Sequence, residues 1–198
     1  MKSICRWTTW AALCGSAVAG PATATDLDGV RLDDSAQVAG RDLKLNGAGL
    51  SLRLVFKVYA ISLYLVEPRK TAEEVLNSDG PRRLAILMLR DVSGEEFGRA
   101  MADSVAEHAG SSSTAAPIDN GVLRVGLSIA AQARGLRKGD RLTMDWVPGV
   151  GAVIELNQKP LIAPVADQRF YTALLSVWLG AKPADPALKT KLLGRAPV

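Results

Sequence analysis

The stretch that most constrains the fold of this chain is residues 51–66, SLRLVFKVYAISLYLV, which is dominated by β-branched, aromatic and large aliphatic residues. Such residues fit a pleated sheet better than a helix, so the stretch predicts one long β-strand. Alternation along a strand places Arg53, Lys57 and Tyr59 on one face and a nearly continuous apolar row on the other. The face with Tyr59 becomes apolar toward Leu63. We therefore expect a strand that leaves a solvent-accessible cleft and enters the core.

The rest of the chain mixes helix and strand signals. Helix-capping patterns occur at Thr71, Ser93, Asp167 and Asp185. Buried or alternating strand patterns cover residues 82–92, 141–147 and 152–156, and Pro148-Gly149 joins the last two in a hairpin. There is no β-α-β rhythm and no internal repeat. The sequence therefore predicts an α+β domain, in which an antiparallel sheet carries helices on one side.

The first 24 residues have the layout of a secretory signal peptide. Lys2 and Arg6 precede an apolar stretch over residues 7–19, and Ala22-Thr23-Ala24 supplies the small-x-small pattern of a cleavage site. That stretch is shorter than the about 20 apolar residues that a membrane-spanning helix needs. We expect cleavage near Ala24 and a periplasmic or secreted single domain over residues 25–198, without stable membrane insertion. An uncleaved N-terminal anchor is the alternative.

The composition argues against several kinds of chemistry. Both cysteines, Cys5 and Cys14, lie within the predicted signal peptide, and His108 is the single histidine. Zinc sites need several Cys or His ligands, and a serine triad needs a histidine beside its nucleophile. The formal net charge of +4 is too small to indicate nucleic-acid binding. We expect no metal, no cofactor and no nucleic-acid partner.

One polar cluster stands out on spacing. Arg53, Lys57 and Tyr59 share a face beside residues that otherwise read as buried. A guanidinium, an ammonium and a phenol on the wall of an apolar cleft could hold a carboxylate, enolate or phenolate. The alternative is a sheet face whose long basic side chains extend to solvent. The pattern alone leaves both interpretations open.

Several motifs, taken in order, resemble those of the chalcone isomerase family. They are Asn46-Gly47-Ala48-Gly49, residues 57–65 (KVYAISLYL), residues 89–93 (LRDVS) leading to Phe97, Lys138-Gly139-Asp140, residues 176–180 (SVWLG) and residues 186–189 (PALK). The resemblance covers nearly all of residues 25–198, and it is strongest to the bacterial, exported branch. It implies an open-faced β-sandwich, in which a Gly-Ala-Gly turn leads into a long strand, a layer of helices covers a large antiparallel sheet, and a ligand cleft lies between the two layers.

The resemblance also suggests which residues form the site. The plant enzymes bind a chalcone phenolate beside an arginine, a threonine, a tyrosine and an asparagine. The corresponding positions here are Ser51 for the arginine, Tyr59 for the threonine, Phe97 for the tyrosine and Ser104 for the asparagine, with a later helix position at Ser176 or Val177. Arg53 lies two residues after Ser51, which keeps the strand face, so it could replace the missing guanidinium.

Phe97 has no hydroxyl to orient a water or a ketone, so the groups that stabilise the oxyanion in the enzymes are mostly absent. The leading hypothesis is therefore a non-catalytic protein that binds a small amphipathic anion, a fatty acid or a phenolic. Non-catalytic relatives bind fatty acids through an arginine and a tyrosine, which Arg53 and Tyr59 could imitate. The alternatives are an intramolecular lyase or isomerase that uses Tyr59 and acts on a chalcone-like substrate, and a scaffold for a protein partner.

Overall fold

The computed structural model describes residues 24–53, 56–109, 124–129, 131, 134–183 and 185–195. The predicted signal peptide, residues 1–24, therefore lies outside the described residues except for Ala24. The strands are β1 (Ala24–Leu27), β2 (Val30–Asp33), β3 (Ser35–Val38), β4 (Arg41–Arg53), β5 (Phe56–Leu65), β6 (Arg82–Met88), β7 (Arg141–Val147), β8 (Gly151–Leu156) and β9 (Lys159–Pro160). The helices are α1 (Ala72–Leu76), α2 (Gly94–Ala109), α4 (Gln168–Leu179) and α5 (Pro186–Leu192).

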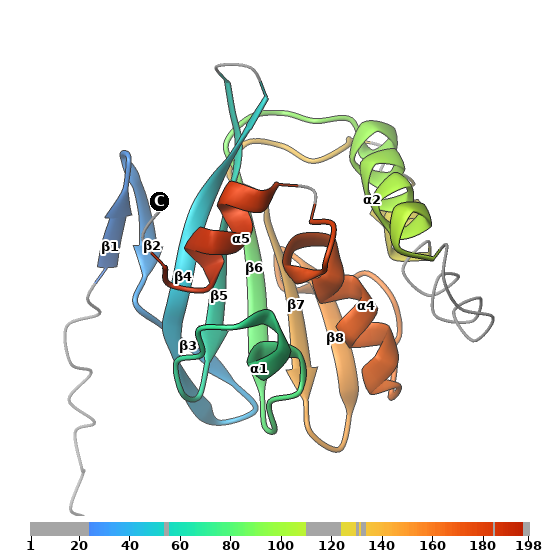
Figure 1. Cartoon of the computed structure of the whole chain (residues 1–198). Coiled ribbons are helices and arrows are strands. Elements are labelled where there is room, and N and C mark those ends of the chain that lie inside the picture. The colour runs from blue at the N-terminus through green and yellow to red at the C-terminus, as the bar shows by residue number, and fades with distance from the viewer. Residues whose placement is uncertain are drawn as a thin grey trace, which may run out of the picture.

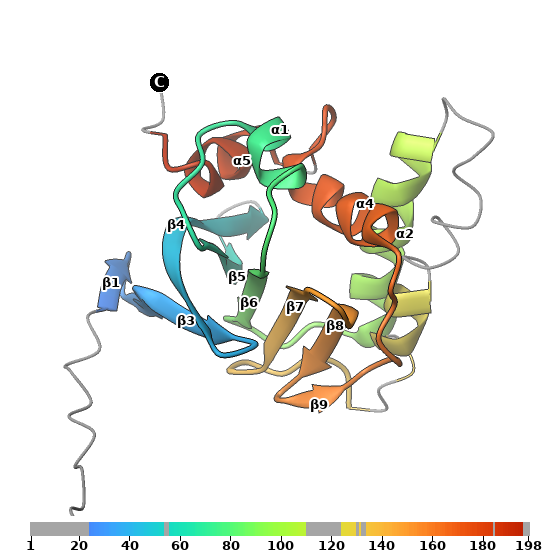
Figure 2. The same ribbon diagram turned by 90° about the horizontal axis from the view of Figure 1, so that it is seen from below.

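A single antiparallel sheet organises the molecule. Strands β3 to β9 are hydrogen-bonded side by side in chain order, and β1 and β2 form a separate two-stranded ribbon. The sheet is strongly curled, and the labelled helices cover one of its faces, with α1, α5 and α4 across it and α2 toward the β7–β8 side (Figures 1 and 2). This confirms the predicted α+β class with helices on one side of an antiparallel sheet.

The main core lies between the sheet and the helices. It joins the inward residues of the central strands, such as Ile61, Leu84 and Met144, to Leu174 and Trp178 of α4. A smaller cluster occupies the opposite face of the sheet and contains Val38, Leu43, Tyr64 and Ala85. Burying both faces explains why β5 and β6 are apolar almost throughout rather than alternating.

The predicted helix-capping residues do cap helices in the structure. Thr71 and Glu74 form a complete capping box at the start of α1, and the side chain of Ser93 accepts a hydrogen bond from the amide of Glu96. The side chains of Asp167 and Asp185 accept bonds from the first amides of α4 and α5. None of the helices in the described part of the chain is long and apolar enough to cross a membrane.

Residues 51–66 do not form the single strand that their composition predicts. β4 ends at Arg53 and β5 begins at Phe56, and the two strands pair as an antiparallel hairpin. The stretch carries no Gly, Pro, Asn or Asp to mark the reversal, so no residue that favours turns could reveal it. Arg53 and Tyr59 consequently lie on adjacent strands, not on the same one.

The register of this hairpin also contradicts the prediction that Lys57 lies on the same face as Tyr59. Ser51 pairs with Tyr59, but Leu52 pairs with Lys57, so Val58 is an extra residue in β5. Leu52 follows Ser51 directly and belongs to the opposite face of the ribbon. Lys57, paired with Leu52, therefore lies on the face opposite Tyr59. A β-bulge shifts the alternation by one residue, which the periodicity count could not foresee.

The motif Asn46-Gly47-Ala48-Gly49 is not a turn, because it lies within β4. Its glycines let helix α5 approach the strand closely. A Cβ atom at Gly47 would stand 2.1 Å from the carbonyl oxygen of Lys191, and one at Gly49 would stand 2.4 Å from a methyl group of Leu188. The side-chain amide of Asn46 donates to the carbonyl of Leu192 at 2.8 Å and ties the same helix to the strand.

Candidate functional site

The residues singled out by sequence come from four elements, the strands β4 and β5 and the helices α2 and α4. Ser51 on β4 is the direct register partner of Tyr59 on β5, and Tyr59 in turn pairs with Met88 at the end of β6. Phe97 lies in the first turn of α2, and Val177 lies near the end of α4. Phe97 and Val177 belong to the core between the two layers, and Tyr59 packs against that core.

Tyr59 and Trp178 form the polar contact that joins the layers in this region. The indole Nε1 of Trp178 donates to the hydroxyl oxygen of Tyr59 at 3.1 Å. Trp178 is buried and Tyr59 is half-buried, so the phenol lies where the core meets accessible space. A phenol that accepts one bond still has its own proton to donate, which suits it to meet a carboxylate or a phenolate.

The core against which Tyr59 packs is apolar. Met88, Phe97 and Val177 are all buried in the main core cluster, against which Tyr59 packs. Phe97 contributes an aromatic ring with no hydrogen-bonding group. The Tyr59–Trp178 pair is a polar contact beside this core, and the half-buried Ser51 is the register partner of Tyr59. An apolar wall with few polar groups is typical of sites for amphipathic molecules.

Two of the predicted residues have side chains outside the described structure. The backbone of Arg53 ends β4 and pairs with Phe56, two residues beyond Ser51 toward the tip of the hairpin. The backbone of Ser104 lies in α2. Lys57 does not join the predicted polar cluster, because its ammonium binds the carboxylate of Asp28 at 2.5 Å and the carbonyl oxygen of the same residue at 2.9 Å. The three-residue cluster of Arg53, Lys57 and Tyr59 is therefore not assembled as predicted.

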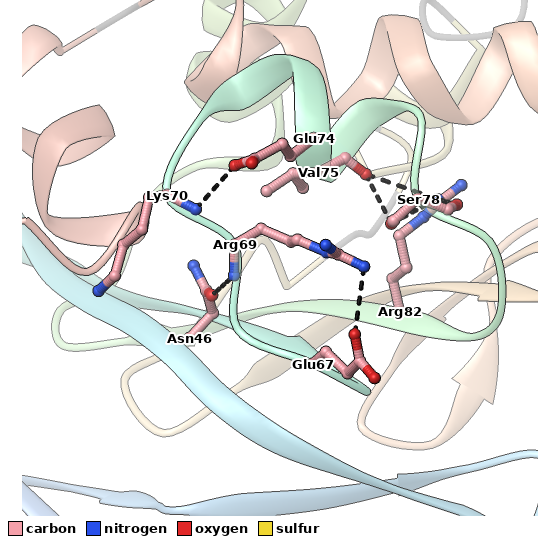
Figure 3. Close-up of polar contacts among 8 residues, drawn as sticks. All are labelled: Asn46, Glu67, Arg69, Lys70, Glu74, Val75, Ser78 and Arg82. Atoms are coloured by element: carbon pink, nitrogen blue, oxygen red, sulfur yellow. Dashed lines mark hydrogen bonds and ion pairs between the residues drawn. The ribbon is translucent and has the colours of Figure 1, made fainter.

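A second unusual polar group lies at the other end of β6. Arg82 is buried beneath α1, where its Nη1 donates to the carbonyl and hydroxyl of Ser78 and to the carbonyl of Val75 (Figure 3). Its guanidinium lies 5.4 Å from the ring centre of Tyr171. Burial lowers the pKa of Arg82 and raises that of Tyr171. Its Nε and Nη2 atoms are buried and have no hydrogen-bond partner among the described residues.

An open hollow of about 340 Å³ lies near Arg82, beside the end of β5 at Leu65. Its charged lining residues are Arg41, Glu67, Arg69 and Asp79. The side chain of Arg69 forms an ion pair with Glu67 at 3.3 Å, and its main-chain amide donates a hydrogen bond to the side-chain oxygen of Asn46 (Figure 3). The positive and negative side chains balance, and the hollow lies at the opposite end of β5 from Tyr59. It therefore does not belong to the predicted site.

The motif Lys138-Gly139-Asp140 forms a structural network. The Asp140 carboxylate accepts bonds from Arg134 at 3.0 Å, from the amide of Arg137 at 2.7 Å and from Asn157 at 2.8 Å. Burial by itself raises the pKa of Asp140, but these hydrogen bonds outweigh it and lower the pKa overall. The motif ties the start of β7 to the turn after β8. Within the described residues, no group of three His, Cys, Asp or Glu side chains could hold a metal ion.

Comparison with known proteins identifies the family. The model of the chalcone isomerase-like family matches residues 24–194. The chain belongs to the chalcone isomerase-like family. Among solved structures that share the fold is a fatty-acid binding protein of Arabidopsis thaliana, with a TM-score of 0.60 and 13% sequence identity, over 86% of this chain and 96% of that one. No curated protein matches the sequence.

The family fold explains which features the sequence analysis missed. The bond between Tyr59 and Trp178 joins residues 119 positions apart, and only the packing of α4 on the sheet creates it. Trp178 and Val177 read as core positions of an amphipathic helix, and the structure does bury both. The pattern of residues 82–92 indicated a buried strand, but it did not show that the guanidinium of Arg82 would be buried as well.

Proposed function

We propose that this chalcone isomerase-like protein is exported and non-catalytic and binds a small amphipathic anion, a fatty acid or a phenolic acid, between its sheet and its helices. The acyl or aryl part lies against the wall of Met88, Phe97 and Val177. Arg53 and Tyr59 hold the anionic group at the mouth, beside Ser51. The observation that carries the proposal is the Tyr59–Trp178 contact, a polar pair set at the edge of an otherwise apolar wall.

The residue types at the enzyme positions support binding rather than catalysis. Ser51 provides no guanidinium and Phe97 provides no hydroxyl, so two of the groups that would stabilise an oxyanion are replaced. An apolar ring at position 97 extends the surface available to a hydrocarbon chain or an aromatic ring instead. Ser104 on α2 would lie further along the same helix.

Two further observations favour an exported carrier. A fatty-acid binding protein has the same fold, which favours a ligand of this class. The basic start, apolar stretch and Ala22-Thr23-Ala24 of the N-terminus support export through a signal peptide. A carrier of this kind works in the periplasm or outside the cell and requires no cofactor.

The proposal predicts that Arg53→Ala weakens the binding of a fatty acid such as palmitate by about 10- to 100-fold, because a hydrogen-bonded charge partner of the carboxylate is lost. Arg41→Ala is the matched control, since Arg41 is an exposed arginine at the opposite end of the same strand. Titration calorimetry measures both affinities, and thermal unfolding shows that both variants remain folded. Equal affinities of the Arg53→Ala variant and the unmodified protein would contradict the site assignment.

The enzymatic alternative makes a different prediction for the same region. An intramolecular lyase that uses Tyr59 would cyclise a chalcone, and Tyr59→Phe would abolish that turnover while leaving the apolar wall intact. Absorbance at the chalcone band measures the reaction directly. Turnover that depends on the Tyr59 hydroxyl would replace the carrier proposal with an isomerase.

A further inference from the structure

The tip of the β4–β5 hairpin exposes large apolar side chains. Leu52 is 54% exposed and Phe56 is 60% exposed, although most large apolar residues in the described part of the chain are buried. The register of β5 with β6 ends at Tyr59–Met88, so beyond this point the β4–β5 ribbon extends alone, past the rest of the sheet (Figure 1). We define the hairpin tip as Leu52, Arg53, Phe56 and Lys57.

The apolar residues of the hairpin tip occur on both faces of the ribbon. Leu52 pairs with Lys57, and Arg53 pairs with Phe56. Successive residues of a strand belong to opposite faces, so these two pairs lie on opposite sides. A protein partner that docks on one face would cover Leu52 or Phe56 and leave the other exposed. A medium that surrounds the tip covers both.

The charges at the hairpin tip are all positive. Each apolar residue stands across from a cation, Lys57 for Leu52 and Arg53 for Phe56. The sequence contains no acidic residue between Asp42 and Glu67. The ion pair of Lys57 with Asp28 is on the surface, with side chains 38% and 69% exposed, so its ammonium can exchange this partner for another anion. Apolar side chains flanked by long cations suit the boundary between lipid headgroups and acyl chains.

We propose that the hairpin tip inserts into the surface of a membrane that contains anionic lipids. Leu52 and Phe56 enter the apolar side of the interface, and Lys57 contacts lipid phosphates. Ser51 and Tyr59 form the next register pair along the ribbon, so docking through the tip would place the proposed ligand site next to the lipid. The docking surface goes beyond the proposed function and does not depend on a bound ligand.

Sedimentation with lipid vesicles tests this inference. The protein is mixed with vesicles of phosphatidylcholine alone or of phosphatidylcholine with phosphatidylglycerol. We expect binding to the anionic vesicles that weakens with added salt, and about tenfold weaker binding for the double variant Leu52→Ser/Phe56→Ser, which removes two apolar anchors. Leu127→Ser/Val150→Ser is the matched control, because these residues are 58% and 48% exposed elsewhere on the molecule. All variants carry the same N-terminus, so any contribution of residues 7–19 to vesicle binding is the same in each of them.

A second variant reports insertion without removing apolar surface. Phe56→Trp keeps an aromatic ring at the hairpin tip, and we expect its added emission to shift to the blue with anionic vesicles but not without them. Equal vesicle binding of the Leu52→Ser/Phe56→Ser variant and the unmodified protein, or no blue shift for Phe56→Trp, would overturn the inference. Loss of self-association in the double variant, with no vesicle binding by either protein, would assign the tip to a protein contact and also overturn it.

The outcome is separable from that of the proposed function. The vesicle assay contains no fatty acid, whereas the affinity for palmitate is measured without vesicles. If the tip docks as proposed, Leu52→Ser/Phe56→Ser keeps the affinity for palmitate and loses vesicle binding. A protein that binds vesicles through the tip but never binds palmitate would contradict the carrier and leave the docking surface in place.

Discussion

Arg82 shows how a charged residue can be part of this core. Its guanidinium is buried, and among the described residues it forms no ion pair with a carboxylate. The carbonyl oxygens at the end of α1 and the face of Tyr171 provide the negative electrostatic environment instead. Burial lowers the pKa of Arg82, because the charged form is removed from water. The residue therefore fills space beneath α1 in addition to donating hydrogen bonds there.

This balance predicts different effects for two substitutions. Arg82→Ala should lower the free energy of unfolding by about 3 kcal/mol or more, because it leaves a cavity and removes the hydrogen bonds to Ser78 and Val75. Arg82→Met should cost less than half as much, since it fills the same space and removes a buried charge. Chemical denaturation measures both values. If Met is as damaging as Ala, the hydrogen bonds rather than the packing hold α1 in place.

Asp140 gives a prediction for the dependence of stability on pH. Its pKa is lowered in the folded protein, so its contribution is fully present above the ordinary carboxyl pKa of about 4 and is lost as the pH falls through the lower, folded value. Asp140→Asn should therefore destabilise the protein by roughly 1–3 kcal/mol at neutral pH, through lost charge-assisted bonds. The difference from the unmodified protein should shrink as the pH approaches 3. Parallel stability curves for the two proteins would contradict this role.

At the scale of the elements, the position of α5 follows from the glycines of β4. The backbone of the helix approaches Gly47 too closely for any side chain, whereas at Gly49 the nearest atom is the end of a flexible leucine side chain. The resemblance pointed to these glycines without giving their purpose. Their expected role in a turn was wrong, because the sequence cannot show that a distant helix will pack against them.

The two glycines should therefore respond differently to the same change. Gly47→Ala forces the strand away from the α5 backbone, and we expect a loss of about 3 kcal/mol in the free energy of unfolding, at the upper end of the usual cost of overpacking. Gly49→Ala should cost clearly less, because the side chain of Leu188 can rotate. Denaturant midpoints of the two variants compare the costs directly. Equal losses would mean that helix α5 adjusts its position readily.

The central hairpin shows where prediction from sequence ends at this scale. The β character of residues 51–66 was clear, as were the capping boxes and the hairpin between β7 and β8, because each depends on local residue types. The reversal after Arg53 and the bulge at Val58 were not predictable, since neither is marked by residues that favour turns. Both features changed the site: the reversal places Arg53 on the strand beside Tyr59, and the bulge turns Lys57 to the other face.

At the scale of the whole molecule, a curled sheet covered by helices on one face leaves a single interface between two layers (Figure 2). The fold class and the family could be predicted from the sequence. The order of the motifs and the types of the elements do not depend on where a single strand ends or which way one side chain faces. For the candidate site, the sequence could predict which residues to consider but not which of them contact one another. The contact between Tyr59 and Trp178 requires the packing of α4 on the sheet, which no local pattern encodes.

The same arrangement suggests how the two proposals work together. The hairpin tip and the Tyr59–Trp178 contact lie along one ribbon, with Ser51 between them in register. A protein with this layout could take up an amphipathic anion from the lipid surface on which it docks. In that case Leu52→Ser/Phe56→Ser should slow the transfer of a fluorescent fatty acid from vesicles while leaving its affinity in solution unchanged. Stopped-flow fluorescence separates the transfer rate from the affinity.

The most direct test of the carrier proposal is mass spectrometry of the small molecules released when the protein, purified from its native exported fraction, is denatured. The account predicts one fatty acid or phenolic acid in a stoichiometric amount, and a reduced amount from Arg53→Ala but not from Arg41→Ala. Protein that is recovered from that fraction without any stoichiometric small molecule, and that stays empty after incubation with fatty and phenolic acids, would contradict it.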